Sequence, residues 1–279
     1  ELHLKGVFDG YNGTGDIPKR AMIGPRPWPL RPWAGYHYEM LRWYDHWLKG
    51  MDTRVMEGPP IQLYIQGENT WRSEKEWPLK RTEFRELYLG GGKNGLEGTL
   101  SDSAGAEQTR RIDFDAASTE AWHGEPRLVY RTEPMSRDME LTGPLALHLQ
   151  ASSTATDTDW VVSVADESPD GQHRELCKGW LRASHRKIDA AKSTLAQPFH
   201  PHLAAEPLEP GTVYEFPIEI WPICNVFKPG HRIRLEIANS DSIIASQGRP
   251  HVTLRNKATN TIYEGGRKAS RLVVPVIPG

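Results

Sequence analysis

The feature that most constrains the fold is a series of alternating segments between residues 128 and 186. Within it, apolar side chains occupy every second position of two segments: Leu145, Leu147 and Leu149 in the first, and Trp160, Val162 and Val164 in the second. A Pro-Asp-Gly turn follows at 169–171. A period of two, with tight turns between the segments, is typical of antiparallel strands that bury one face. We therefore predict β structure throughout this region.

Similar short segments recur from about Pro60 to the C-terminus, so most of the chain is predicted to be β. The 279 residues include 25 glycines and 22 prolines, which suits many turns better than a helical bundle. We predict a mainly β chain in which residues 59–279 form a jelly-roll or β-sandwich domain. The polar stretch at 90–110 and the Pro-rich stretch at 198–210 are expected to be loops, although a short strand could end at Leu100-Ser-Asp within the first.

Residues 1–58 have a different pattern. Residues 2–11 are compatible with an amphipathic helix, and residues 19–23 predict a short strand that ends before Gly24 and Pro25. Residues 36–49 predict a second helix with one apolar stripe, formed by Tyr36, Met40, Trp43, Tyr44 and Trp47. Strand, loop and helix together indicate the end of an α/β unit.

Composition and charge argue against two classes of partner. The net charge of −2 gives no general attraction to nucleic acid or to an anionic membrane. The apolar runs are also far shorter than the roughly 20 residues that span a bilayer. Cys177 and Cys224 are expected to be buried free thiols, which leave the compartment open. Our assignment is cytoplasmic, with secretion as the alternative.

Two polar motifs have residue types found in metal sites but not the required spacing. Asp157–Asp159 and Asp166–Gly171 do not match the spaced oxygen ligands of a calcium loop, and the second motif is typical of a tight turn. His200 and His202 have no further Cys or His at zinc spacing. We expect no metal at these positions.

Residues 230–237 predict an amphipathic strand with charged side chains on its outer face. These are Arg232, Arg234 and Glu236. Two such arginines can clamp a carboxylate, but exposed Arg and Glu more often form surface ion pairs of small energetic value. We expect surface pairs here.

The chain has no visible nucleophile for serine hydrolysis. That chemistry needs a serine on a sharp turn, a histidine base and an acid that orients the base. No Gly-x-Ser-x-Gly sequence occurs in the 279 residues. The chain alone is therefore not expected to run that mechanism.

Several motifs of the predicted β region nevertheless occur in the order and spacing of a known family. They are Gly143-Pro144, Ser152-Ser153 with Asp157–Asp159, Asp166–Gly171, Gly179–Arg186 and Val226–Leu235. With them the chain resembles the C-terminal part of the cocaine-esterase and X-Pro dipeptidyl-peptidase family of α/β-hydrolases. The resemblance implies a jelly-roll domain that packs on the catalytic domain and helps to shape the active-site cleft. It also implies that residues 1–58 are a C-terminal remnant of the α/β-hydrolase domain.

The resemblance implies roles in that remnant too. Residues 19–25 are similar to the last strand of the catalytic domain and to the Gly-Pro turn before its catalytic His, and residues 36–50 are similar to the helix that follows. At the expected His position this chain has Trp28. His37 is the nearest replacement as the catalytic base, or it is an ordinary residue at the start of a helix.

The acid of the triad has two alternative positions. Residues 6–11 are similar to the family's Gly-x-Tyr-Asp-Gly turn, which would make Asp9 the acid. In the competing alignment residues 2–11 form the helix after that turn, and the acid precedes Glu1. The chain begins at Glu1 without a Met, so we expect a fragment or a processed product.

The resemblance implies that a longer parent protein is a serine hydrolase of the acyl-esterase or X-Pro dipeptidyl-peptidase type, with no cofactor. It would act through an acyl-enzyme. Expected partners are a small acyl ester or peptide substrate, the remainder of the catalytic domain, and a second copy in a homo-oligomer. The alternatives are a non-catalytic β-sandwich module that binds carbohydrate and an inactive hydrolase homologue.

Overall fold

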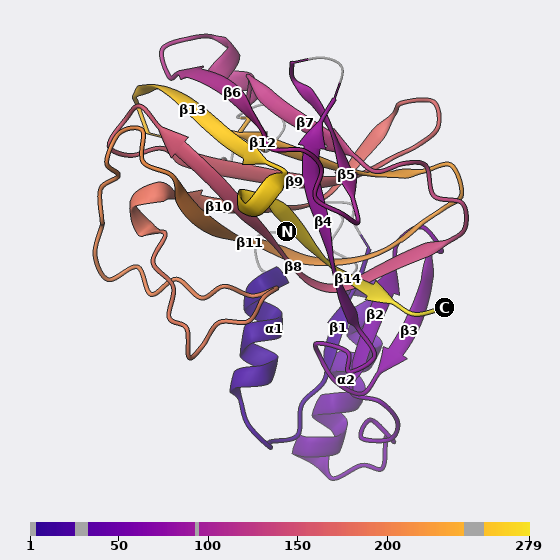
Figure 1. Cartoon of the computed structure of the whole chain (residues 1–279). Coiled ribbons are helices and arrows are strands. Elements are labelled where there is room, and N and C mark those ends of the chain that lie inside the picture. Colours follow the sequence, from indigo (N-terminus) through magenta and orange to yellow (C-terminus); the bar gives the residue numbers. More distant parts are fainter. Residues whose placement is uncertain (1–3, 26–32, 93–94, 243–253) are drawn as a thin grey trace. The chain divides into compact units, whose positions relative to one another are not determined.

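The computed structural model describes residues 4–25, 33–92, 95–242 and 254–279 (Figure 1). Strands make up 45% of the structure and helices 13%, so the prediction of a mainly β chain is confirmed. The chain divides into two compact units. The N-terminal unit comprises Glu1–Lys80 with Cys224–Val226, and the β unit comprises Arg81–Ile223 with Phe227–Gly279.

The N-terminal unit combines two helices with a small mixed sheet. Its elements are α1 (Leu4–Gly13), β1 (Ala21–Ile23), α2 (Trp33–Lys49), β2 (Ile61–Ile65) and β3 (Thr70–Glu74). β1 and β2 are parallel, and β3 is antiparallel to β2. The core is formed by the apolar side chains of Phe8, Ile61, Leu63, Ile65, Trp77 and Val226. Both predicted helices are present, although α2 begins three residues earlier than expected.

The first two strands after α2, β2 and β3, belong to the N-terminal unit. Ala21 at the start of β1 donates its N–H to the Pro60 carbonyl at 3.0 Å, and β1 then pairs with β2 from Ala21 to Ile23. The predicted domain boundary at 58/59 therefore falls inside this unit, between α2 and β2. β2 alternates like the later strands, so local pattern alone did not assign it to β1. β3 has no apolar alternation and was not predicted.

The β unit contains the remaining strands. They are β4 (Glu83–Gly91), β5 (Glu97–Ser101), β6 (Gln108–Asp115), β7 (Arg127–Arg131), β8 (Met139–Ser153), β9 (Asp159–Glu167), β10 (His173–Arg182), β11 (Tyr214–Phe227), β12 (Arg232–Ala238), β13 (Lys257–Glu264) and β14 (Arg271–Ile277). Single 3-10 turns are η1 (Glu120–His123), η2 (Ala183–His185) and η3 (Gly266–Lys268).

The β unit has a closed, barrel-like or sandwich-like pairing. Its strands follow the order β11-β10-β9-β12-β7-β5-β4-β14-β8-β13-β6. β8 also pairs with β11, so the pairing returns on itself, and β13 and β6 extend the sheet beyond β8. β5 and β7 are parallel, whereas the pairs on either side of them are antiparallel. The long strand β8 supports this arrangement because it pairs with β14 over its first half and with β13 near its end.

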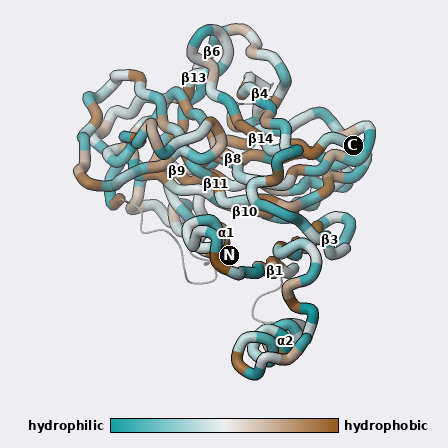
Figure 2. Tube along the Cα trace, turned by 90° about the horizontal axis from the view of Figure 1, so that it is seen from below, coloured by the Kyte–Doolittle hydropathy of each residue, from teal (hydrophilic) through white to brown (hydrophobic). Residues whose placement is uncertain are grey.

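The predicted strands β8 and β9 are confirmed, and the six apolar residues that predicted them are fully buried in the core: Leu145, Leu147, Leu149, Trp160, Val162 and Val164. The expectation that only one face would be buried is wrong, because the other face of each strand is largely buried too. Full burial of one such side chain stabilises the fold by about 1.5–3 kcal/mol. Apolar stretches also run along β8, β9 and β14 in Figure 2, where they are brown. The core of the β unit is thus built on the period-two pattern that the sequence displays.

Two sequence expectations are wrong in part. Residues 90–110 were expected to be a loop, but they hold the end of β4, all of β5 and the start of β6. Glycines and charged residues in these strands interrupt the alternation of apolar and polar residues by which a strand is recognised in a sequence. The strand expected at 251–255 lies largely outside the described residues, and β13 begins later, at Lys257.

Candidate functional site

The two candidate triad residues lie on separate helices of the N-terminal unit. Asp9 is in the middle of α1, where its exposed carboxylate pairs with Lys5 one turn earlier at 3.2 Å. His37 is in the first part of α2 and is exposed. Asp9 thus forms an ion pair with Lys5 within the same helix. Trp28, at the position expected for the catalytic His, lies outside the described residues.

Tyr36 connects the start of α2 to the end of β1. A Cβ at Gly24 would overlap the Tyr36 hydroxyl group, so the glycine allows close approach. Burial raises the pKa of Tyr36, and a hydrogen bond with the Gly24 backbone partly offsets this effect. The contact thus places the residue before His37 beside Gly24. In the sequence Tyr36 belongs to the predicted apolar stripe of the helix, and no sequence signal reveals its contact with Gly24.

Most of the apolar side chains described on α2 are exposed. The exposed fraction is 66% for Tyr38, 77% for Leu48 and 47% for Trp47, and Met40, Leu41 and Tyr44 are also exposed. A contiguous apolar face is unusual on a soluble monomer and marks an interaction surface. The apolar stripe of α2 therefore does not pack into the core of the N-terminal unit.

The motifs that carry the resemblance in the β unit have structural roles. The Asp157 carboxylate accepts hydrogen bonds from the backbone and hydroxyl groups of Ser184, at 2.8 and 2.7 Å. Asp159 accepts from Arg182 at 3.1 Å and from the Leu254 N–H at 2.7 Å. These bonds link the segment at the start of β9 to the 3-10 turn η2 and to the residues that precede β13. Within the described residues, no group of three or more His, Cys, Asp or Glu could hold a metal ion.

The predicted turn after β9 is confirmed. Gly171 has a φ of 83°, and its N–H donates to the Ser168 carbonyl at 2.9 Å. The Asp170 carboxylate accepts a hydrogen bond from the Gln172 N–H at 3.1 Å, so a side chain also stabilises the turn. The carboxylate is therefore used by the turn, as the Pro-Asp-Gly sequence predicts.

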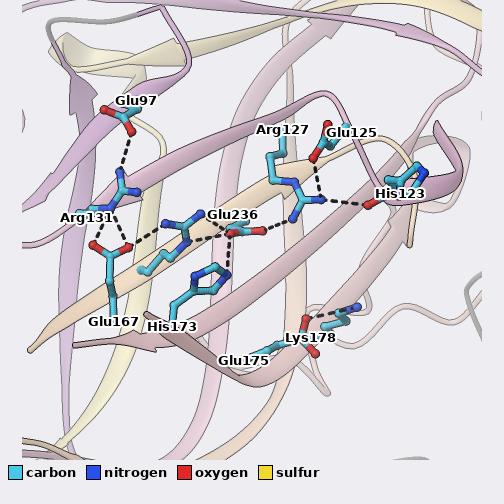
Figure 3. Close-up of polar contacts among 11 residues, drawn as sticks. Glu97, His123, Glu125, Arg127, Arg131, Glu167, His173, Glu175, Lys178 and Glu236 are labelled. Carbon is cyan, nitrogen blue, oxygen red and sulfur yellow. Dashed lines mark hydrogen bonds and ion pairs between the residues drawn. The ribbon is translucent and has the colours of Figure 1, made fainter. Parts of the chain in front are cut away.

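The outward arginine of β12 belongs to a charge network that is much less exposed than expected. The network consists of Glu97, Arg131, Glu167, Arg234, Glu236 and Arg127 (Figure 3). Arg234 reaches Glu167 and Glu236 at 2.7 Å each. Both carboxylates are buried. Surface ion pairs were expected here, but neighbouring strands β7 and β9 surround the β12 charges with more charge, a context that local sequence does not reveal.

The arginines favour ionised carboxylates in this network. Burial opposes ionisation of Glu167, but hydrogen bonds from Arg131 and Arg234 outweigh burial and lower its pKa. Burial likewise opposes ionisation of Glu236, and the charges of Arg127 and Arg234 lower its pKa on balance. Both groups bind protons more weakly when folded than when unfolded, so their contribution to stability is present above the unfolded pKa, near 4.3. It is lost as the pH falls through the folded values.

We therefore expect the β unit to lose stability on acidification below about pH 4.5, the range in which free glutamates protonate. Glu236→Gln should lower stability at neutral pH and should flatten this acid dependence, because the variant has one carboxylate fewer to protonate. Urea unfolding at a series of pH values measures both effects. Glu83→Gln, at an exposed pair with Arg85, is the matched control. An acid slope that is the same in both variants would contradict this role of the network.

Among the helices of the described residues, none has the length and apolar character needed to cross a membrane. Cys177 and Cys224 are free thiols, the first buried and the second partly exposed.

Comparison with known proteins identifies the family. A family model described as the X-Pro dipeptidyl-peptidase C-terminal non-catalytic domain matches residues 53–273. The cocaine esterase of Rhodococcus sp. (strain MB1 Bresler) is 29% identical over 271 residues, which cover 84% of this chain and 44% of the esterase.

Solved structures share the fold. A CocE/NonD family hydrolase from Staphylococcus aureus matches 99% of this chain and 52% of its own, with a TM-score of 0.83 and 23% identity. An aminopeptidase from a marine sediment archaeon, Thaumarchaeota archaeon, matches 92% of this chain and 47% of its own, with a TM-score of 0.71 and 20% identity. The chain spans about half the length of these proteins or less. It belongs to the cocaine-esterase and X-Pro dipeptidyl-peptidase family of hydrolases and carries the C-terminal non-catalytic domain of that family.

Proposed function

We propose that this chain is the C-terminal part of a serine hydrolase that cleaves acyl esters or X-Pro peptides through an acyl-enzyme, with the nucleophilic serine outside the chain. The observation that carries the proposal is the match of residues 53–273 to a domain described as non-catalytic, in a family whose relatives are named as an esterase and peptidases. The absence of a Gly-x-Ser-x-Gly sequence from the 279 residues agrees with it.

In this proposal residues 53–273 belong to the family's C-terminal jelly-roll domain, and the elements before them, α1, β1 and α2, are the end of the α/β-hydrolase domain. The parallel pair β1 and β2, with α2 between them in the chain, supports this assignment because parallel strands joined by a helix are typical of α/β folds. The exposed aromatic face of α2 supports it as well. The occupant of that face would be the remainder of the catalytic domain.

The proposed mechanism is two-step acyl transfer. A serine elsewhere in the parent attacks the ester or amide carbonyl, while a histidine takes its proton and later returns it to the leaving group. We assign His37 as this base, since Tyr36 holds the start of α2 at the Gly24 turn. For the acid, the helical position of Asp9 and its pairing with Lys5 favour the alignment in which the acid precedes Glu1. No cofactor takes part.

A fluorophosphonate probe tests where the nucleophile lies. It reacts covalently with activated serines, so it should label the full-length parent protein and leave this isolated chain unlabelled. Heat-denatured parent is the control, because labelling must depend on the folded site. Labelling of the isolated chain would place the nucleophile within the 279 residues and overturn the proposal. An unlabelled native parent would overturn it in favour of an inactive homologue or a binding module.

A further inference from the structure

β6 forms an open edge of the β unit. It is the terminal strand of the sheet and pairs with β13 from Gln108 opposite Glu264 to Asp115 opposite Lys257, without a bulge. Among the residues that the structure describes, no strand pairs with its other side. In Figure 1, β6 lies beyond β13 at the top of the view. An unpaired strand edge is a template for another strand, and proteins protect or use it.

Two hydrogen bonds show which backbone groups of β6 face outward. The Ala116 N–H donates to the Asn256 carbonyl at 3.0 Å, so even-numbered positions of β6 direct their backbone groups toward β13. Opposite Asp113, the Thr259 carbonyl accepts from the Thr154 N–H at 3.0 Å, on the far side of β13. The odd-numbered positions of β6 therefore present their N–H and C=O groups to the open edge.

The side chains at these outward positions are polar or charged and lie at the surface. Arg111 and Asp113 are the central pair and are exposed, with Thr109 and Asp115 at either side. Asp113 accepts a hydrogen bond from the Thr259 hydroxyl at 2.6 Å. In the described part of the chain Arg111 forms no ion pair. The centre of the strand thus carries one positive and one negative side chain, two residues apart, on the same face.

We propose that β6 pairs antiparallel with β6 of a second copy of this chain, about a two-fold axis at Ile112. This register sets Arg111 opposite the partner's Asp113 and, by symmetry, Asp113 opposite the partner's Arg111. It also sets Thr109 opposite the partner's Asp115. All the outward backbone groups then meet outward groups of the second copy, as a hydrogen-bonded antiparallel ladder requires.

Charge selects this register over its neighbours. A shift by two residues in one direction would set Arg111 against Arg111, and a shift in the other would set Asp113 against Asp113. Like charges directly opposite one another destabilise a strand pair, whereas opposite charges stabilise it. A slip by one residue would direct backbone groups away from each other and is excluded by the pleat. The edge is thus self-complementary in one register.

The opposing interpretation is that these charges only protect the edge from pairing, which is a common use of charged residues there. The two interpretations differ in what charge exchange does. If the charges repel any second strand, exchanging them changes nothing. If they pair across a two-fold axis, reversing one charge creates two repulsions, and reversing both restores two attractions.

Sedimentation equilibrium of the whole chain over a wide concentration range tests the proposal. We expect the unmodified chain to dimerise, and Arg111→Asp and Asp113→Arg each to weaken the dimer by at least about tenfold. The double variant Arg111→Asp with Asp113→Arg should recover the dimer, because the acid at position 111 of each copy then faces the base at position 113 of the other. Arg85→Asp, at an exposed position of β4, is the matched control and should associate like the unmodified chain.

Far-UV circular dichroism of each variant checks that the fold is kept, which the exposure of Arg111 and Asp113 favours. Association through the apolar face of α2 would persist in both single variants. The proposal is therefore overturned if the single variants associate like the unmodified chain, if the double variant fails to recover, or if the unmodified chain is monomeric throughout.

Discussion

Replacing His37 by alanine in the full-length parent is expected to lower the turnover of a p-nitrophenyl ester by at least about 10³-fold, the scale set by removal of a triad histidine. Without the base, the serine keeps its proton and attacks the carbonyl only slowly. Substrate binding does not need the imidazole, so the loss should appear in kcat more than in KM. Steady-state kinetics of the purified parent measure both constants.

His46→Ala is the matched control for this experiment. His46 lies in the last turn of the same helix, and its Nδ1 is 3.2 Å from the Met51 carbonyl. The two variants remove the same group from opposite ends of α2, so damage to the helix would lower activity in both. Unchanged turnover in His37→Ala, together with continued labelling of the parent by fluorophosphonate, would discard His37 as the base but leave the serine hydrolase intact.

Asp9→Asn separates the two positions of the acid. Asp9 is exposed in α1 and pairs with Lys5, so we expect its replacement to leave ester turnover unchanged, as the alignment with the acid before Glu1 requires. A loss of turnover comparable to that of His37→Ala would instead make Asp9 the acid. The outcome therefore decides how residues 1–13 are aligned with the family.

The parts of the fold that could be predicted are those in which the local pattern agrees with the environment. In β8 and β9 every second side chain is a large apolar residue of the core, which is the pattern that predicted these strands. The burial of their other face could not be predicted, because it depends on what the rest of the chain places there. β6 was missed because its inward positions include Arg110 between polar neighbours, which breaks the apolar alternation. The partner that makes this burial tolerable, Glu264, is 154 residues away in the sequence.

The candidate site shows the same limit. His37 was identified from its distance to the Gly-Pro turn, whereas the contact between Tyr36 and Gly24 depends on how α2 returns to β1. The charge network also required three strands, β7, β9 and β12, to lie side by side. Sequence therefore indicated which chemistry was missing from this chain. It did not show which charged side chains the sheet would bury together.

Glu264→Ala is expected to destabilise the β unit by about 3–5 kcal/mol, the usual cost of removing one partner of a buried ion pair. Glu264 is fully buried, and its Oε1 accepts from the Arg110 Nε at 2.9 Å and from the Tyr130 hydroxyl at 2.5 Å. The carbonyl groups of Gly95 and Glu97 also accept from Arg110 but do not neutralise it. Removal of the carboxylate would take from this buried arginine the counter-ion that Glu264 provides.

A double-mutant cycle separates the interaction from the loss of packing. Arg110→Met with Glu264→Met replaces both charges by apolar side chains, and such replacements are often neutral or stabilising. The double variant should therefore be less destabilised than the sum of the two single variants. Urea unfolding followed by a probe in the β unit measures each free energy. Glu83→Ala, which breaks the exposed pair with Arg85, should cost less than about 1 kcal/mol. If Glu264→Ala costs no more than this control, the buried pair does not stabilise the contact of β13 with β6 and β7.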